Sequence, residues 1–196
     1  VIITRTGFSN ERGWEFYLRP ENNAEAVGNR IWKAGQAHGM ILTGTPVFRA
    51  RRIEAGLMSQ AEFDETTTPY DAGLGHFVKI DDRDFIGKAA LETADKRNRT
   101  FGMRVRGGIA ERGRTMSIDG KIVGQVCSSS WSPFQECGVA LVRVDDPATG
   151  PGTEVRVLGN DQKIYEAVLC ALPMYDAAGD IVRGRVTDLP SGPDPW

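Results

Sequence analysis

The start of the chain switches between strand-like and turn-like stretches. Residues 1–6 are rich in β-branched side chains, and residues 14–19 are aromatic and apolar. Both stretches have the composition of β-strands, and the polar, Gly-containing residues 7–13 between them are typical of a turn. The pattern therefore predicts a β-hairpin.

Apolar residues take on a helical spacing after the hairpin. Residues 22–38 predict an amphipathic helix, and Gly39 fits its C-terminal cap. Residues 40–42 (Met-Ile-Leu) predict a short buried strand or turn. A second helix is predicted to start at Thr45-Pro46, with Thr45 as the N-cap and Pro46 at the first helical position.

A different pattern begins after the charged linker 96–99, where short apolar stretches recur with turns between them. Strands are predicted at residues 100–105, 115–118, 121–127, 137–144, 153–158 and 163–172. Asp119-Gly120 is typical of a type I′ hairpin turn. Gly124, inside a strand pattern, predicts a bulge or a close approach of another backbone. Strands of this length and spacing favour a small antiparallel barrel.

We therefore expect an α+β protein with two domains, an α+β region at residues 1–97 and a β-barrel domain at residues 98–196. A short helix from Lys88 to about Asp95 ends the first region. The chain lacks an initiator Met, and its first residues have the pattern of a strand interior, which favours a fragment or a processed chain.

Composition and charge narrow the class of protein. The chain has 196 residues, of which 40% are hydrophobic and 26% charged, as in ordinary globular proteins. A net charge of −2 supplies no basic field for nucleic acid or anionic lipid, and no apolar run reaches the length of a membrane span. Three cysteines without zinc spacing and two distant histidines argue against a metal site. Reduced cysteines and the lack of a signal peptide favour the cytoplasm.

Glu15 is a carboxylate inside the aromatic stretch of the predicted hairpin. A charge in such a run either faces solvent or meets a specific polar partner. Alternation along the strand places it opposite Trp14 and Phe16, so the spacing alone favours a solvent-facing side chain.

Three arginines crowd the second predicted helix. Arg49 and Arg52 are three residues apart and can share a face, and Arg51 lies between them. Guanidinium groups suit carboxylates, so an anion-binding role is possible. The alternative is a solvated basic helix face, and both interpretations remain open. The chain contains no nucleophile elbow, P-loop or dinucleotide-binding glycine motif.

The order of several motifs resembles the C-terminal portion of the glycine-cleavage T-protein (aminomethyltransferase) superfamily. The hairpin from Thr6 to Phe16 is similar to the family's hairpin motif Y-T-G-E-x-G-(F/W)-E-(I/V/F). Four further stretches are similar to family motifs: 51–57 to L-R-L-E-A-G-L, 68–74 to T-P-x-E-A-G-L, 85–91 to F-I-G-K-x-A-L, and 120–133 to the barrel signature.

The resemblance implies part of a ferredoxin-like folate-binding lobe followed by the barrel. It implies tetrahydrofolate as the cofactor and a small-molecule methyl or aminomethyl donor as the substrate. The carboxylate of Glu15 would accept hydrogen bonds from the pterin ring, and Arg52 would lie on the folate side, where the anionic glutamate tail is held.

The chain also departs from the family pattern. The family's catalytic Asp lies upstream of every motif present here, so the resemblance implies that transfer needs a separate N-terminal lobe. Gln60 stands where the aminomethyltransferase branch usually has Tyr, and the hairpin looks more like those of demethylases that use dimethylsulfoniopropionate or aryl methyl ethers. Three hypotheses remain: a folate-dependent one-carbon transferase, a non-catalytic folate-binding or regulatory module, and the transferase-like C-terminal region of a flavin-dependent demethylating dehydrogenase.

Overall fold

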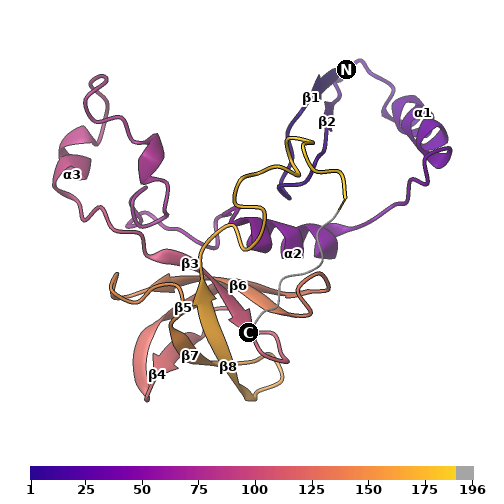
Figure 1. Cartoon of the computed structure of the whole chain (residues 1–196). Helices are drawn as coiled ribbons and strands as arrows, with labels where there is room; N and C mark the ends of the chain where they lie inside the picture. Colours follow the sequence, from indigo (N-terminus) through magenta and orange to yellow (C-terminus); the bar gives the residue numbers. More distant parts are fainter. Residues whose placement is uncertain (189–196) are drawn as a thin grey trace.

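A closed β-barrel with two projecting arms makes up the protein, seen here in a computed structural model that describes residues 1–188 (Figure 1). The N-terminal arm, residues 1–42, and the loop arm, residues 58–95, extend from the barrel on different sides of helix α2 (Thr45–Ala55). The predicted α+β class with an antiparallel barrel is confirmed. Residues 189–196 of the expected 98–196 domain lie outside the described range.

The N-terminal arm contains the predicted hairpin and helix. Its elements are β1 (Ile2–Thr4), β2 (Glu15–Tyr17) and α1 (Ala24–Gln36). The two strands pair antiparallel, with Ile3 opposite Phe16. The Asn23 side chain caps α1 by accepting a hydrogen bond from the backbone N–H of Ala26 at 2.9 Å.

The stretch after α1 differs from its prediction. Residues 40–42 form no strand, and Ile41 and Leu42 are 80% and 78% exposed. An apolar run predicts burial only when another part of the chain packs on it, and no described residue covers this one. Thr45 is the first residue of α2, whose N-cap is Gly44, so the predicted helix start is wrong by one residue.

The barrel closes through six antiparallel strands in the order β3-β6-β5-β4-β7-β8. The strands are β3 (Thr100–Val105), β4 (Thr115–Ile118), β5 (Lys121–Ser132), β6 (Cys137–Val144), β7 (Glu154–Leu158) and β8 (Ile164–Cys170). The loop arm contributes only the short helices η1 (Gly75–Phe77) and α3 (Lys88–Thr93). All six predicted strands are present, in the predicted places.

Two predicted backbone features of the barrel are confirmed. Asp119 and Gly120, between β4 and β5, have φ angles of 48° and 81°, as a type I′ turn requires. A Cβ atom added to Gly124 would lie 2.3 Å from the carbonyl oxygen of Arg143, so this position needs the small residue because another backbone passes close to it.

Strand β5 continues past its predicted end at Cys127 as far as Ser132. Residues 128–132 pair with β6 from Leu141 to Cys137, and the register shifts near Cys127. Serines are weak strand formers, but the ladder to an apolar neighbour strand outweighs their intrinsic preference. This extension places the serines of β5 beside α2.

The core explains why α2 sits where it does. Strand β6 is buried on both faces: Val142 belongs to the barrel interior, while Val139 and Leu141 pack outward with Ile53 of α2. Ile53 is completely buried. Because each buried aliphatic side chain contributes ~1.5–3 kcal/mol, this contact fixes α2 against the outside of the barrel.

Candidate functional site

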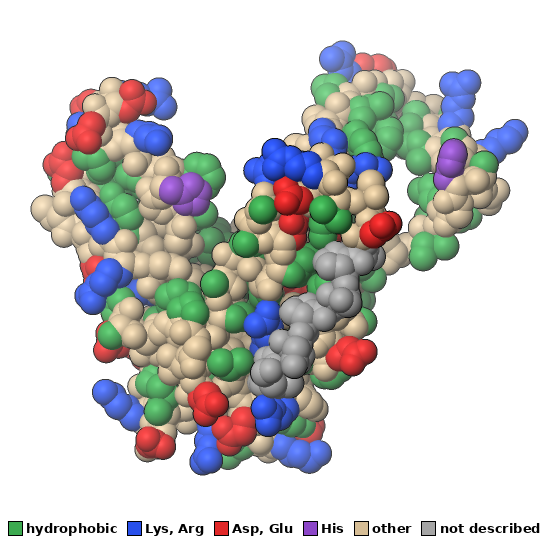
Figure 2. Space-filling model, viewed as in Figure 1, with side chains coloured by type: hydrophobic (Ala, Val, Ile, Leu, Met, Phe, Trp, Pro, Cys, Tyr) green, Lys and Arg blue, Asp and Glu red, His purple; other side chains and the backbone are tan. Residues whose placement is uncertain are grey.

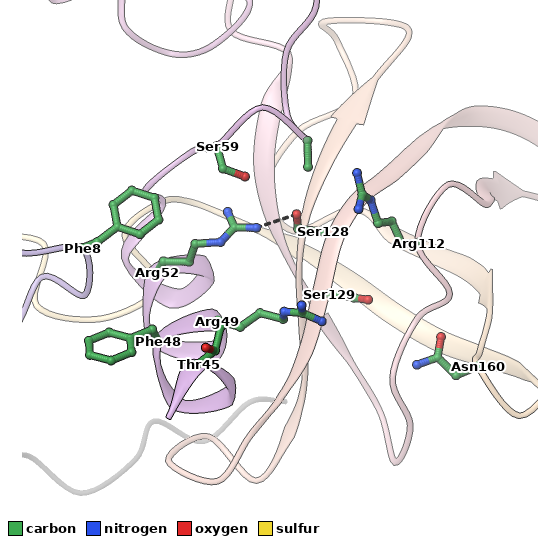
Figure 3. A pocket seen from close by; sticks show the side chains of 11 residues that line it. Phe8, Thr45, Phe48, Arg49, Arg52, Ser59, Arg112, Ser128, Ser129 and Asn160 are labelled. Atoms are coloured by element: carbon green, nitrogen blue, oxygen red, sulfur yellow. Dashed lines mark hydrogen bonds between the residues drawn. The ribbon is translucent and has the colours of Figure 1, made fainter. Parts of the chain in front are cut away.

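A pocket of about 530 Å³ lies between α2 and the barrel, at the root of both arms (Figure 3). Phe8 comes from the N-terminal arm, and Ser59 and Ala61 come from the start of the loop arm. The remaining lining residues are Thr45, Phe48, Arg49 and Arg52 of α2, Ser128 and Ser129 of β5, and Arg112 and Asn160 of barrel loops. The site therefore depends on the extension of β5 that the sequence pattern missed.

Arg52 lines this pocket but is already compensated. Its Nη1 lies 3.2 Å from a carboxylate oxygen of Glu62, and its Nη2 donates a hydrogen bond to Ser128 Oγ at 2.7 Å. Nη1 also donates to the backbone carbonyl of Leu57 at 3.1 Å. The side chain is 11% exposed. The interpretation of a solvated basic face is thus wrong for Arg52, which ties α2 to the loop arm and to β5.

Glu62 completes this tie from the loop arm. Its carboxylate is fully buried and also accepts from the backbone N–H and the hydroxyl of Ser59, at 2.6 and 3.0 Å. A buried carboxylate needs this many donors because burial without partners is costly. The network holds the Ser59 wall of the pocket in place.

Arg49 and Arg112 give the pocket its charge. Both residues are exposed and line the pocket from opposite sides, one on α2 and one on a barrel loop (Figure 3). Neither forms a hydrogen bond or an ion pair with another residue of 1–188, and the side chains that line the pocket within this range include no carboxylate. Two uncompensated guanidinium groups that face one cavity favour an anionic ligand.

Glu15 lies on β2 and has polar partners. The hydroxyls of Thr6 and Tyr17 both donate hydrogen bonds to its Oε2, the latter at 3.1 Å. Its Oε1 has no partner among the described residues. Glu15 is not one of the described residues that line the pocket, so the structure does not bring Glu15 and Arg52 into the same cavity.

A second, more apolar pocket of about 630 Å³ adjoins the first along α2. Arg49, Ser129 and Asn160 line both pockets. The second pocket adds an apolar wall made by Val47, Ile109, Trp131, Pro133 and Phe134. Together they form a groove with a basic end and an apolar end.

Two family models match the chain in succession. The description "GCVT N-terminal domain" covers residues 1–82, and "Glycine cleavage T-protein C-terminal barrel domain" covers residues 96–176. The chain belongs to the glycine-cleavage T-protein family.

Relatives and a solved structure of the T-protein family agree with this assignment. The aminomethyltransferase of Streptomyces coelicolor is 36% identical, with 89% of this chain and 49% of that protein covered. The crystal structure of the glycine cleavage system aminomethyltransferase T from Bartonella henselae has a TM-score of 0.76 and 26% identity, and the match covers 89% of this chain and 49% of that chain. The chain spans about half the length of these relatives.

A longer protein also shares the T-protein unit. A trimethylamine-oxide aldolase of Ruegeria pomeroyi is 34% identical, with 90% of this chain but only 23% of that protein covered. The same unit therefore occurs inside proteins of different length.

The T-protein hairpin is tied to α2 through Arg51. Its guanidinium contacts the rings of both Phe134 and Tyr175, 5.1 and 5.0 Å from their centroids, and forms an ion pair with Glu11 of the turn 7–13. The Tyr175 hydroxyl donates a hydrogen bond to Glu11 at 2.6 Å. Burial and this hydrogen bond raise the pKa of Tyr175. This cluster fixes the turn that carries Phe8 into the pocket.

Two residues of the T-protein pocket carry no recognisable signal in the sequence. Arg112 follows β3 in a loop, and Asn160 stands in the connection between β7 and β8. Only the closure of the barrel brings these loops beside α2. Within residues 1–188, no cluster of His, Cys, Asp and Glu could hold a metal ion, and no helix combines the length and the hydrophobicity needed to cross a membrane.

Proposed function

We propose that this chain binds tetrahydrofolate and takes part in the transfer of a methyl or aminomethyl unit from a small-molecule donor. The observation that carries the proposal is the pocket between α2 and the barrel, which is lined by Phe8 and Phe48 on one side and by the uncompensated Arg49 and Arg112 as well. A folate combines a flat ring system with an anionic glutamate tail, and such a lining suits both parts.

Glu15 is proposed as the acceptor for the N–H groups of the pterin ring. Its Oε1 has no partner among residues 1–188, and an ionised carboxylate has room for about four hydrogen bonds. Glu15 shares a hairpin with Phe8, so the ligand would extend from the pocket toward β2. Arg52 would lie near the glutamate tail, but Glu62 already compensates it, so Arg49 and Arg112 would supply most of the attraction.

Tetrahydrofolate supplies the nitrogen that accepts the one-carbon unit. The residues of this chain would bind the folate and orient it, which is how proteins contribute when a cofactor holds the reactive atom. The catalytic carboxylate is expected from an N-terminal lobe. We also propose a cytoplasmic location, which three buried, unpaired cysteines support.

Replacement of one pocket arginine tests the site. In calorimetric titrations with tetrahydrofolate under reducing conditions, Arg112→Gln is expected to weaken binding about fivefold, because it removes one charge-assisted contact. Arg114→Gln is the matched control, because Arg114 lies in the same loop but pairs with Glu111 at 3.0 Å. An absence of binding to the unmodified chain would reject the folate proposal. An equal effect of both variants would reject the local role of Arg112.

Glu15→Gln tests the pterin contact separately. In the complete protein this variant is expected to weaken tetrahydrofolate binding about tenfold, because a neutral amide replaces a charged acceptor. Glu21→Gln, at the end of the same hairpin and 65% exposed, should leave the affinity unchanged. Identical affinities for all three proteins would show that Glu15 has no part in the site.

The match to the longer aldolase favours a second candidate, in which this unit serves inside a larger demethylating enzyme. A third possibility is a folate-binding or regulatory module without catalysis. A screen of methyl and aminomethyl donors with the chain and its N-terminal lobe separates the three. Turnover of an aminomethyl donor supports the first, turnover of N-methylated donors alone supports the second, and folate binding without turnover supports the third.

A further inference from the structure

Both faces of the N-terminal hairpin are largely open to solvent. In β1, the neighbouring residues Ile2 and Ile3 are 49% and 58% exposed, and in β2 Phe16 and Tyr17 are equally open. Successive side chains of a strand point to opposite faces, so both faces of this sheet leave about half of their apolar side-chain surface uncovered by residues 1–188. The segment after β8 touches the hairpin, where Arg5 donates a hydrogen bond to the backbone carbonyl of Val182 at 2.6 Å, but it does not bury these four side chains. Helix α1 has no buried residue either.

The loop arm also exposes large apolar side chains. Phe77 is 71% exposed and Ile86 is fully exposed. Leu74, Phe77 and Phe85 also line an open groove of about 470 Å³ in this arm. Figure 2 shows that the molecule is hollowed between the loop arm and the N-terminal hairpin, with hydrophobic side chains near the hollow on both sides.

The barrel differs from the arms in this respect. Its exposed large hydrophobic residues are few, namely Ile122, Trp131 and Ile164. Isolated apolar side chains on a surface are normal, whereas a contiguous set indicates an interface. A two-stranded hairpin is also marginally stable by itself. The arms thus have the composition of a packed interior without the layer that would cover it.

We propose that the two arms and the hollow between them form a docking surface for the half of the T-protein fold that has no counterpart in this chain. The occupant follows from the comparisons, because the chain covers 49% of the solved T-protein and 49% of its Streptomyces relative. The surface serves this role whether the other half is part of the same polypeptide or a separate one. It does not depend on which ligand the pocket binds.

The probe for this surface is the part of the Streptomyces coelicolor aminomethyltransferase to which this chain has no match. We add it as a separate polypeptide, and in a second experiment we fuse it ahead of Val1. The fusion makes the contact intramolecular, so it no longer depends on the concentration of the probe. Sedimentation velocity is expected to show an equimolar complex. Hydrogen exchange should slow in residues 1–18 and 74–91 in the complex and in the fusion, and stay unchanged in the barrel strands.

Charge substitutions locate the contact. Ile3→Asp and Phe77→Asp are expected to weaken the complex at least about tenfold, because each would bury an unpaired carboxylate. Ile164→Asp is the matched control, since Ile164 is 71% exposed on the barrel. Circular dichroism of the free variants verifies that they fold. Arms that still exchange rapidly in the fusion would overturn the proposal. The proposal would also be overturned if this chain alone formed dimers in which hydrogen exchange of the arms is slow, because a second copy of the chain would then be the occupant.

Discussion

The barrel and the arms use apolar residues in opposite ways. Strand β6 in the barrel is covered on both faces, by the barrel interior and by α2, while both faces of the β1–β2 sheet are open. Burial of apolar surface is the main source of stability, so the two regions should contribute unequally to it. The comparison teaches that an apolar stretch of sequence does not by itself secure burial, because residues 1–188 cover the apolar residues of the barrel but leave those of the arms exposed.

The largest difference is expected from one substitution made in both regions. Leu169→Ala, at a fully buried position of β8, should lower the free energy of unfolding by about 4 kcal/mol through lost burial and a cavity. Leu42→Ala, at a position that is 78% exposed, should change it by less than about 0.5 kcal/mol. Urea unfolding measures both. Similar losses would break the contrast between barrel and arms.

A smaller loss of stability is expected at alkaline pH, and it arises from residues of the barrel. Cys127, Cys137 and Cys170 all lie in barrel strands, and burial raises their pKa from 9.0 to about 11. A pKa that is higher in the folded state gives stability that is complete below pH 9 and is lost as the pH rises toward 11. The free energy of unfolding should fall by about 1 kcal/mol per thiol between pH 9 and 10.

Cys170→Ala separates the thiols from other groups that titrate in this range. Urea unfolding at pH 9 and pH 10 gives the fall in the free energy of unfolding between the two pH values. This fall should be about 1 kcal/mol smaller for the Cys170→Ala variant than for the unmodified protein, because the variant has one buried thiol fewer. An equal loss in the two proteins would show that the Cys170 thiol does not contribute.

The smallest effect on stability is expected from alanine substitutions at two glycines that have similar backbone conformations. Gly39, after α1, and Gly120, in the β4–β5 turn, have φ angles of 72° and 81°, and an added Cβ would meet nothing within 4 Å at either position. Alanine at Gly120 should cost about 1 kcal/mol of global stability because it disfavours this backbone region. Gly39→Ala should reduce the helicity of α1, seen by hydrogen exchange, with little change in the urea midpoint. If Gly39→Ala lowered the free energy of unfolding as much as the substitution at Gly120 does, the N-terminal arm would have to unfold together with the barrel.

Much of the fold could be predicted because its signals are local. The β4–β5 turn follows from Asp119-Gly120, and alternating apolar residues mark the strands. The misses depend on distant partners. Residues 40–42 have the composition of a buried segment, but no described residue covers them. Residues 128–132 have weak strand preference, and only pairing with β6 makes them a strand.

The site was less predictable for the same reason. Arg49 and Arg52 were rightly placed on one helix face, but the sequence does not show that Glu62 compensates Arg52 and leaves Arg49 uncompensated. Arg112 reaches the pocket from a loop that is distant along the chain. The roles of Glu15 and Arg52 in folate binding stay predictions.

The position of the pocket at the root of both arms has a thermodynamic consequence. Phe8 and Ser59 are walls of one cavity and also belong to the two segments that project from the barrel. A ligand held between them would restrict the angle between the arms, and a docked partner would restrict the same angle. Each event would then reduce the ordering entropy left for the other, so ligand and partner would strengthen each other's binding by equal factors.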